Sequence, residues 1–440
     1  MSNPIYITDT ELAGDLKNFY NDMRTELFPI STPLFASIKK AGRGGPKKVN
    51  WGGNGAYFDV VLNPPVNWGV NAAGELPPSS QTTEVQGNLG VVRFYVRRQF
   101  DNLAMVGTQS KQAAFISLRS KIANEFKGAM QLGMQEMLQG NGTGVRGIVS
   151  GTTGAPVSAI DVISPYGIAG AGQGGLWLYK GMYIAIRSSN GLTLRGKTYI
   201  QSVTNSGDTA SIVFSSTIAG VVNTDIIVAA TANNDSYGQY SNGLMNITNR
   251  AGAFPTLHAI NSGTAGQERW DATRLTAGSG SIGQTPQEMD IWQLATLVGA
   301  KSGKNAITNP REFMLVTTFG IQQQLIQNVL GQRNLNVSGS QKIALPGGYE
   351  AESILGIPLI ADPWCPAGTL YLIHLPSLFW IDAKDWSPVQ YENSGSVRWI
   401  DGYDAFETSF AAYWNLGSDQ RNAHGSIVGY TDTIRYTPVV

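Results

Sequence analysis

Residues 108–139 read TQSKQAAFISLRSKIANEFKGAMQLGMQEMLQ, and this stretch decides the fold. It contains no proline, only two glycines, and mostly residues that favour helix. Apolar or small residues recur at steps of three and four, which predicts one long helix with an apolar stripe. At 1.5 Å per residue, that helix would be roughly 45–48 Å long. The stripe consists of Phe115, Leu118, Ile122, Phe126, Ala129, Gly133 and Met137.

Before this helix, the sequence predicts an extended arm. Residues 56–62 (AYFDVVL) and 91–98 (VVRFYVRR) have the β-branched and aromatic character of strands. The residues between them are polar, rich in proline and poor in core-forming side chains. A long structureless excursion is improbable inside a compact domain, so we expect a two-stranded arm that extends away from the body.

The N-terminal residues predict an amphipathic helix. Thr8 and Glu11 form a capping box, and Leu12, Leu16 and Phe19 follow on one face. That face would bury either against its own domain or against a neighbouring subunit, and the sequence leaves both open.

Residues 142–250 predict a separate β-domain after a glycine-rich, irregular beginning at 141–175. Four short runs separated by turns, at 181–187, 198–203, 210–214 and 225–230, indicate a small antiparallel barrel or sandwich. The remainder mixes helices and strands, which places the whole chain in the α+β class. A capping box at Thr285–Glu288, with Pro286 at the first helical position, predicts a helix over 286–301.

The C-terminal half then predicts a strand at 313–318 and a helix at 319–330 that Gly331 ends. Further strands are expected at 354–361, 369–375 and 378–383. In the strand region 397–418, alternation places Phe406, Phe410 and Trp414 on one face.

Composition restricts the class of function. Of the 440 residues only 14% are charged, which is low for a monomeric enzyme and typical of a protein covered by neighbours. The formal net charge of zero excludes a strongly basic nucleic-acid binder. The single cysteine, Cys365, cannot form an intrachain disulfide, and no apolar run is long enough to span a membrane. The first residues lack signal-peptide features, so we expect a protein used in cytoplasm or released from it by lysis.

Patterns that suggest chemistry are weak. Residues 278–283 match GxGxxG, but the preceding residues do not read as an apolar strand, so we expect a loop. His258, His374 and His424 lack partners at metal-site spacing, and His374 is expected in the core. The acids Asp401, Asp404 and Glu407, like Asp382 and Asp385, are expected to cap turns instead of hydrolysing glycosides. Trp51, Trp68, Trp177 and Trp364 suit either sugar stacking or interface anchoring. We therefore predict no catalysis, no cofactor and no metal.

The order of these parts resembles the major capsid protein of tailed double-stranded-DNA bacteriophages, which has the Hong Kong 97-type shell fold. The resemblance runs along nearly the whole chain. The stretch 108–148 looks like the spine helix and its following turn, GLMNITNRAGAFPTLHAI (243–260) like the return from an insertion, and 354–383 like the closing strands of the axial domain.

The resemblance implies a division of the chain. Residues 1–44 would be the N-arm, 45–103 the E-loop hairpin and start of the P-domain, and 104–141 the spine helix. Residues 142–250 would hold the link and inserted β-domain, 251–310 the return to the P-domain, 311–385 the A-domain, and 386–440 the last P-domain strands.

The resemblance also implies a structural function without catalysis. Copies would assemble as pentamers and hexamers into the icosahedral head of a virion, in the cytoplasm of a host bacterium. The expected partners are the portal protein and the packaged double-stranded DNA. Because the arm begins at residue 8, we also expect either a separate scaffolding protein or none. A decoration protein on residues 176–230 is a further partner to consider. Residues 49–110 contain no lysine, so we expect shells without lysine cross-links.

Residues with expected roles fall into three groups. Arg93, Arg97 and Arg98 would form ion pairs with acids of a neighbouring subunit. The other inter-subunit contacts would involve Leu12, Leu16, Phe19, Trp51, Tyr57, Phe58 and Trp68. The capsomer-centre loop would contain Arg333, Asn334 and Lys342. The residues that face DNA would be Lys39, Lys40, Arg43, Lys47 and Lys48, although a solvated linker explains this cluster equally well.

Two alternatives remain at this point. An encapsulin-type nanocompartment shell would use the same fold around a cargo. A secreted carbohydrate-binding or carbohydrate-active β-protein would instead be a monomer with paired acids in a pocket.

Overall fold

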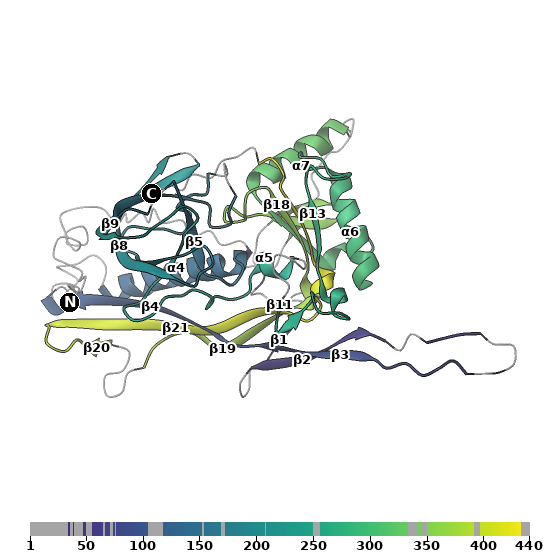
Figure 1. Ribbon diagram of the computed structural model, residues 1–440, viewed down its shortest axis with the longest axis horizontal. Coiled ribbons are helices and arrows are strands. Elements are labelled where there is room, and N and C mark those ends of the chain that lie inside the picture. The colour runs from purple at the N-terminus through teal and green to yellow at the C-terminus, as the bar shows by residue number, and fades with distance from the viewer. Residues whose placement is uncertain are drawn as a thin grey trace. The chain divides into compact units, whose positions relative to one another are not determined.

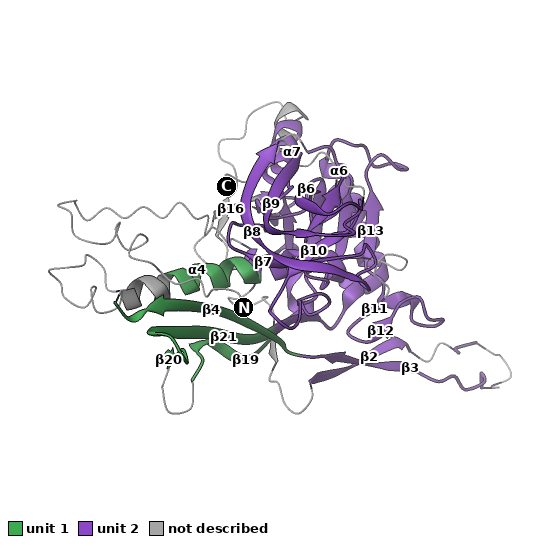
Figure 2. Ribbon diagram, turned by 60° about the vertical axis from the view of Figure 1, so that its left-hand side comes forward, with its two compact units in different colours: residues 1–32, 91–134, 381–414 green, residues 33–90, 135–380, 415–440 purple. Residues whose placement is uncertain are grey.

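The computed structural model describes residues 34, 35, 38, 47–49, 55–64, 67–70, 74, 76–103, 118–151, 154–168, 172–206, 208–249, 256–332, 342–344, 350–390 and 397–432 (Figure 1). The chain divides into two compact units (Figure 2). Unit 1 comprises residues 1–32, 91–134 and 381–414, and unit 2 comprises residues 33–90, 135–380 and 415–440.

The sheet of unit 1 is built around one long strand. Strand β21 (Ala405–Ser418) pairs antiparallel with β4 (Val92–Asp101), from Val92 opposite Trp414 to Asp101 opposite Ala405. The short strand β20 (Val397–Trp399) and strand β19 (Leu378–Pro388) belong to the same sheet. Phe406 and Phe410 pack with buried Phe100 and Phe126, so the predicted alternation of these two phenylalanines is confirmed.

The predicted long helix is present as α4 (Leu118–Gln139), whose 22 residues span about 33 Å. Residues 108–117 lie outside the described part of the chain. Gly133 lets α4 approach β4 closely, because a Cβ there would lie 2.3 Å from Cζ of Phe94. The rings of Phe126 and Phe410 are 4.8 Å apart. The glycine in the apolar stripe is therefore a packing residue.

A closed six-stranded barrel forms part of unit 2. Its strand order is β10-β5-β6-β9-β8-β7. The prediction of a small barrel is confirmed, but residues 141–175 are not irregular throughout, since they supply β5 and β6. Their glycines and polar residues interrupt the apolar pattern that the prediction used. The bounds are β5 Val145–Ser150, β6 Val157–Ile163, β7 Tyr183–Arg187, β8 Leu194–Ser206, β9 Thr209–Ile218 and β10 Ile226–Ala229.

A seven-stranded mixed sheet forms the centre of unit 2. Its order is β13-β22-β18-β14-β17-β16-β15, with parallel pairing only at β13–β22 and β14–β17 among these strands. The bounds are β13 Thr273–Thr276, β14 Phe313–Thr317, β15 Lys342–Ala344, β16 Glu350–Ile354, β17 Ile357–Ala361, β18 Thr369–His374 and β22 Gly425–Val428.

Helices α6 (Glu288–Ser302) and α7 (Phe319–Gln332) pack on one face of this sheet (Figure 1). Ile291 and Leu294 of α6 and Leu325 of α7 share a core with the sheet residues Leu315 and Ile427. Two predicted helix ends are wrong. The N-cap of α6 is Gln287, with Asp290 completing the capping box, and α7 continues past Gly331 to Gln332.

The predicted arm is a hairpin of β2 (Ala56–Asn63) and β3 (Thr83–Leu89). The prediction missed β3, whose polar sequence TEVQGNL lacks a strong strand pattern, and took 91–98 as the second strand. That run belongs to β4 in the other sheet. Shorter elements of unit 2 are β1 (Lys47–Val49), α5 (Leu244–Ile247), β11 (Thr256–Leu257) and β12 (Ile260–Asn261).

Candidate assembly surfaces

The base of the β2–β3 hairpin is anchored in unit 2 by an aromatic cluster. The Phe58 ring lies 5.3 Å from that of Phe379 and 5.8 Å from that of His258, measured between centroids. Phe58 also covers Gly87 on the paired strand, and the backbone N–H of Asn88 donates to the His258 carbonyl at 2.9 Å. The base is thus held by side-chain packing and by the backbone.

Beyond the base, the hairpin exposes large apolar side chains. Trp68 is 85% exposed and Leu76 is 87% exposed, and Val70 is exposed as well. The side chain of Asn67 links the two sides of this segment by donating to the Pro78 carbonyl at 3.0 Å. Apolar groups left in water on a tethered projection gain free energy when a partner covers them, so this segment is a candidate docking element.

The three hairpin residues expected at inter-subunit contacts differ in position. Trp68 and Tyr57 are exposed, which suits a contact, whereas Phe58 faces Phe379 and His258 of its own chain. The sequence could not separate them, because alternate residues of one strand point to opposite faces and only the fold decides which face is covered.

The arginines of β4 have partners within the chain. Arg97 forms an ion pair with Glu407, and Arg98 forms one with Glu125 of α4. Arg93 is exposed opposite Tyr413. Pairing of these arginines with acids of a neighbour stays a prediction, and in the isolated chain Arg97 and Arg98 hold helix and strands of unit 1 together.

The outer face of α6 is a second apolar surface, which the sequence reasoning missed. Ile291, Leu294, Ala295 and Val298 are buried on the inner face, while the outer face exposes three large apolar side chains. These exposed residues are Met289, Trp292 and Leu297. The sequence did contain a signal for this surface, because apolar residues occur on both sides of the 15-residue helix. A helix that buries only one face needs only one apolar stripe.

A buried ion pair joins the end of α4 to the barrel. Arg146 of β5 donates through Nε to Glu136 Oε1 at 2.8 Å and through Nη2 to Glu136 Oε2 at 3.0 Å. The same Nη2 donates to the Tyr240 hydroxyl oxygen at 3.0 Å. Burial raises the pKa of Glu136, and the Arg146 charge opposes that change.

A buried carboxylate, that of Asp362, binds side chains of the same helix, α4, and has no cation among its described partners. Asp362 accepts hydrogen bonds from the Trp364 backbone N–H at 3.0 Å, from the Gln139 amide at 2.8 Å and from the Gln135 amide. The Gln135 oxygen accepts from the backbone N–H of Phe35 at 3.2 Å. Burial raises the pKa of Asp362 to about 6, and the three hydrogen bonds oppose the rise.

The histidines are structural. His374 is buried, as predicted, and its ring bonds Ser377 at 2.7 Å and Glu312 at 3.3 Å. His424 bonds Ser418 Oγ at 2.9 Å. Burial lowers the pKa of both His258 and His424 to about 3, so these two rings are neutral at physiological pH.

The remaining chemistry-bearing residues also have structural surroundings. Cys365 is buried, and burial raises the pKa of its thiol well above the usual range, which disfavours the reactive thiolate. Trp177 and Trp364 are buried and stack at 4.7 Å, so neither offers a face to a sugar. Glu407 pairs with Arg97, and Asp404 accepts from Asn102 at 2.9 Å. Within the described residues, no group of three acids, histidines or cysteines could hold a metal ion.

The GxGxxG segment at 278–283 corrects one detail of the sequence reasoning. A strand, β13, does precede it. Helix α6 begins at Glu288, five residues beyond Gly283, and the next strand along the chain, β14, is not a neighbour of β13 in the sheet. The segment therefore lacks the βαβ arrangement that a dinucleotide fingerprint requires.

Several predicted sites lie outside the described part of the chain. Lys47, Lys48 and Lys342 belong to strands β1 and β15, but their side chains are not described. The others are Leu12, Leu16, Phe19, Lys39, Lys40, Arg43, Trp51, Arg333 and Asn334. Among the helices that the structure describes, none is both long and apolar enough to cross a membrane.

No protein-family model and no curated protein matches this sequence. Solved structures do match. The capsid asymmetric unit of cyanophage A-1(L) is 13% identical, aligns with 97% of this chain and 100% of its own, and has a TM-score of 0.57. The mature capsid of bacteriophage PhiM1 is 8% identical over 94% of this chain and 91% of its own, at a TM-score of 0.44.

An encapsulin complex from Synechococcus elongatus PCC 7942 is 8% identical over 89% of this chain and 88% of its own, at 0.40. The likeness to the cyanophage subunit shows the fold: the chain is a mixed α/β protein with the fold of a phage capsid subunit.

Proposed function

We propose that this protein is a structural subunit of the icosahedral head of a tailed double-stranded-DNA phage. The fold supports this proposal, because the match to the cyanophage A-1(L) capsid subunit extends over nearly all of both chains. The described histidines, Cys365, Asp404 and Glu407 have structural surroundings, which is compatible with this proposal.

The observation that carries the proposal is the β2–β3 hairpin. Its base is fixed to unit 2 through Phe58, and its outer part exposes Trp68, Val70 and Leu76. In a monomer these side chains would be an aggregation liability. In a shell each copy's hairpin would be covered by a neighbour, and the apolar side chains would contribute to assembly.

Within this proposal the parts take the roles of the Hong Kong 97-type fold. The hairpin is the E-loop, and α4 is the spine helix of the P-domain. Residues 311–385, with α7 and strands β14 to β18, are the A-domain, and α6, β13 and β22 belong to the P-domain segments 251–310 and 386–440. The barrel is the inserted domain, and residues 1–44 are the N-arm. Pentamers and hexamers of this subunit enclose double-stranded DNA in the virion, together with a portal protein and a separate scaffolding protein, after assembly in the host cytoplasm.

Electron microscopy and sedimentation of the purified full chain, alone and with added scaffolding protein, test the proposal. The wild type should form closed particles. The double variant Trp68→Ser/Leu76→Ser should fold normally by circular dichroism but assemble only at concentrations at least tenfold higher, because it loses two apolar contacts worth about 1.5–3 kcal/mol each.

A matched control is Leu192→Ser, which removes an exposed leucine from the β7–β8 turn of the barrel. It should assemble like the wild type. A wild-type chain that stays monomeric under every condition would contradict the proposed function.

A further inference from the structure

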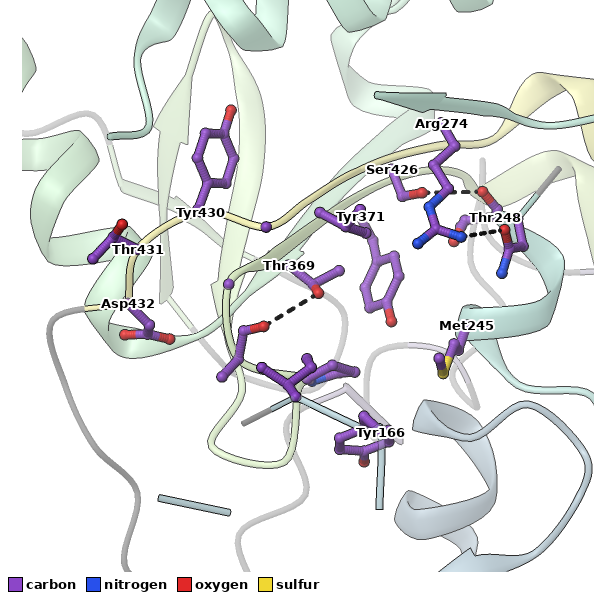
Figure 3. Close-up of a pocket in the computed structure, with 17 residues that line it drawn as sticks. Tyr166, Met245, Thr248, Arg274, Thr369, Tyr371, Ser426, Tyr430, Thr431 and Asp432 are labelled. Atoms are coloured by element: carbon purple, nitrogen blue, oxygen red, sulfur yellow. Dashed lines mark hydrogen bonds between the residues drawn. The ribbon is translucent and has the colours of Figure 1, made fainter. Parts of the chain in front are cut away.

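Unit 2 contains a pocket of about 520 Å³ beside its central sheet (Figure 3). Its floor is the sheet face opposite α6 and α7. The register places Arg274 of β13 opposite Ser426 of β22, and Ser426 opposite Tyr371 of β18. These three side chains therefore form one row across three strands, while their neighbours Leu275, Ile427 and Leu370 point into the helix-covered core.

This row is unusual because it puts polar groups where a sheet normally buries apolar ones. Two members are explained by the fold. Ser426 Oγ donates to the Thr248 carbonyl at 3.1 Å, and Arg274 Nη1 donates to Asn249 Oδ1 at 2.8 Å. Both bonds tie the segment after α5 to the sheet.

Tyr371 is different. Its side chain is only 2% exposed, yet its hydroxyl makes no hydrogen bond with any residue of the described chain. Figure 3 shows its ring directed into the pocket, toward the space between Tyr166 and Met245. The hydroxyl group is reached from the pocket, so it can donate a hydrogen bond to a molecule that enters there.

The lining indicates what that occupant is. The guanidinium of Arg274 carries a permanent positive charge, and the Tyr371 O–H is a neutral donor on the same sheet face. Together they offer a small number of hydrogen-bond donors, which suits a carboxylate. A phosphate dianion usually accepts hydrogen bonds from more donors. Ile168, Met245, Pro366 and Val428 supply an apolar wall. Asp432 also lines the pocket and lies on the side away from Arg274 in Figure 3, so it does not oppose an anion at the Arg274 end.

We propose that this pocket binds a small organic acid, with its carboxylate at Arg274 and Tyr371 and its apolar body against Met245, Pro366 and Val428. The site is independent of the assembly surfaces, because none of its lining residues belongs to the hairpin or to the outer face of α6.

Titration calorimetry with 2-naphthoate on the purified full chain tests the site. The neutral isostere 2-naphthamide is the matched ligand control at the same pH and ionic strength. The wild type should bind the acid saturably and at least tenfold more tightly than the amide. Tyr371→Phe removes only the hydroxyl and should weaken naphthoate binding about tenfold, the usual cost of a lost hydrogen bond to a charged group.

Tyr403→Phe, an exposed tyrosine of unit 1, is the control variant and should bind like the wild type. If Tyr371→Phe does not fold, Arg274→Lys provides a second variant: it keeps the charge, loses the planar fork and should also weaken the acid selectively. Equal binding of acid and amide, or unchanged affinity in the variants, would mean that water alone satisfies Tyr371, and the proposal would be overturned.

Discussion

Glu136 and Arg146 show how single residues connect the parts of unit 2. Both side chains are almost removed from water, so neither charge is tolerated without the other. The two hydrogen bonds between Arg146 and Glu136, and the one to the Tyr240 hydroxyl, replace hydrogen bonds to water that these polar atoms lose on burial. The pair thereby ties β5 to the last turn of α4.

Arg146→Met should lower the free energy of unfolding by about 3–5 kcal/mol, because Glu136 is left buried without a counter-charge. Urea denaturation of unassembled subunits measures this. The double variant Glu136→Gln/Arg146→Met is the control and should recover part of the loss. A double variant less stable than the single one would argue against a charge-specific effect.

Asp362 makes stability depend on pH in a direction unusual for an acid. Its folded-state pKa of about 6 lies above the ordinary value of 3.8, so the folded chain holds the proton more tightly than the unfolded chain. Between these two pH values the folded state binds more protons, and its stability falls as pH rises. The difference between the folded and ordinary pKa values corresponds to a change of roughly 3 kcal/mol in the free energy of unfolding.

Comparison with Asp362→Asn isolates this effect, since asparagine does not titrate. The stability of the wild type minus that of the variant should decrease by up to about 3 kcal/mol from pH 4 to pH 7, with the change centred between pH 4 and 6. Urea titrations at half-unit pH steps provide the measurement. A difference that stays constant over this range would rule out Asp362 as the titrating group.

At the scale of elements, the hairpin depends on a glycine. Phe58 of β2 lies over Gly87 of β3, and a Cβ at position 87 would come within 2.4 Å of the ring. The ring is in turn the anchor against Phe379 and His258. Gly133 plays the same part in α4, where the absence of a side chain leaves room for the Phe94 ring. Both glycines allow close packing against an aromatic ring, and neither forms a turn.

Gly87→Ala should displace the Phe58 ring and lower stability by about 1–3 kcal/mol, the usual cost of overpacking. Gly90→Ala is the control, because a Cβ there would meet no atom within 4 Å. Thermal unfolding of the two variants should separate them by several degrees, with Gly90→Ala close to the wild type. Equal melting temperatures would show that the hairpin base adjusts freely.

Elements were predicted well where periodicity was strong. Helix α4, the strands β2, β4 and β14, and the barrel strands β7 to β10 follow from apolar spacing. Strand β3 was missed because its sequence, TEVQGNL, has too few apolar residues to show a strand pattern. Its pairing with β2 stabilises it as a strand. The start of α6 was misplaced because Thr285 and Gln287 both fit an N-cap, and the surrounding fold selects Gln287.

At the scale of the whole molecule, the outer hairpin and the outer face of α6 leave apolar area uncovered in one chain. Monomeric proteins usually carry charged residues on exposed surfaces, whereas only 14% of this chain is charged. In the proposed shell, repeated modest contacts would add up to high stability, and the stability of the single subunit would understate that of the particle.

Particles of the wild type should run on a denaturing gel as one band of 47.2 kDa, because residues 49–110 contain no lysine for a cross-link from the hairpin. The comparison is between particles analysed immediately and after prolonged storage. Ladders of higher mass in either sample would disprove purely non-covalent reinforcement.

The sequence by itself determined the elements whose side-chain pattern repeats at 2 or 3.6 residues and the low fraction of charged residues, and it shows none of the common catalytic motifs. The tertiary structure alone decided which of two neighbouring residues is buried: Phe58 is an anchor while Tyr57 is exposed, and Arg97 meets Glu407 of its own chain. It also brought Arg274, Ser426 and Tyr371 into one row from segments up to 152 residues apart. The physical reason is that local periodicity reflects contacts between near neighbours in the chain, whereas burial, pairing and pockets depend on contacts between distant segments that no local pattern encodes.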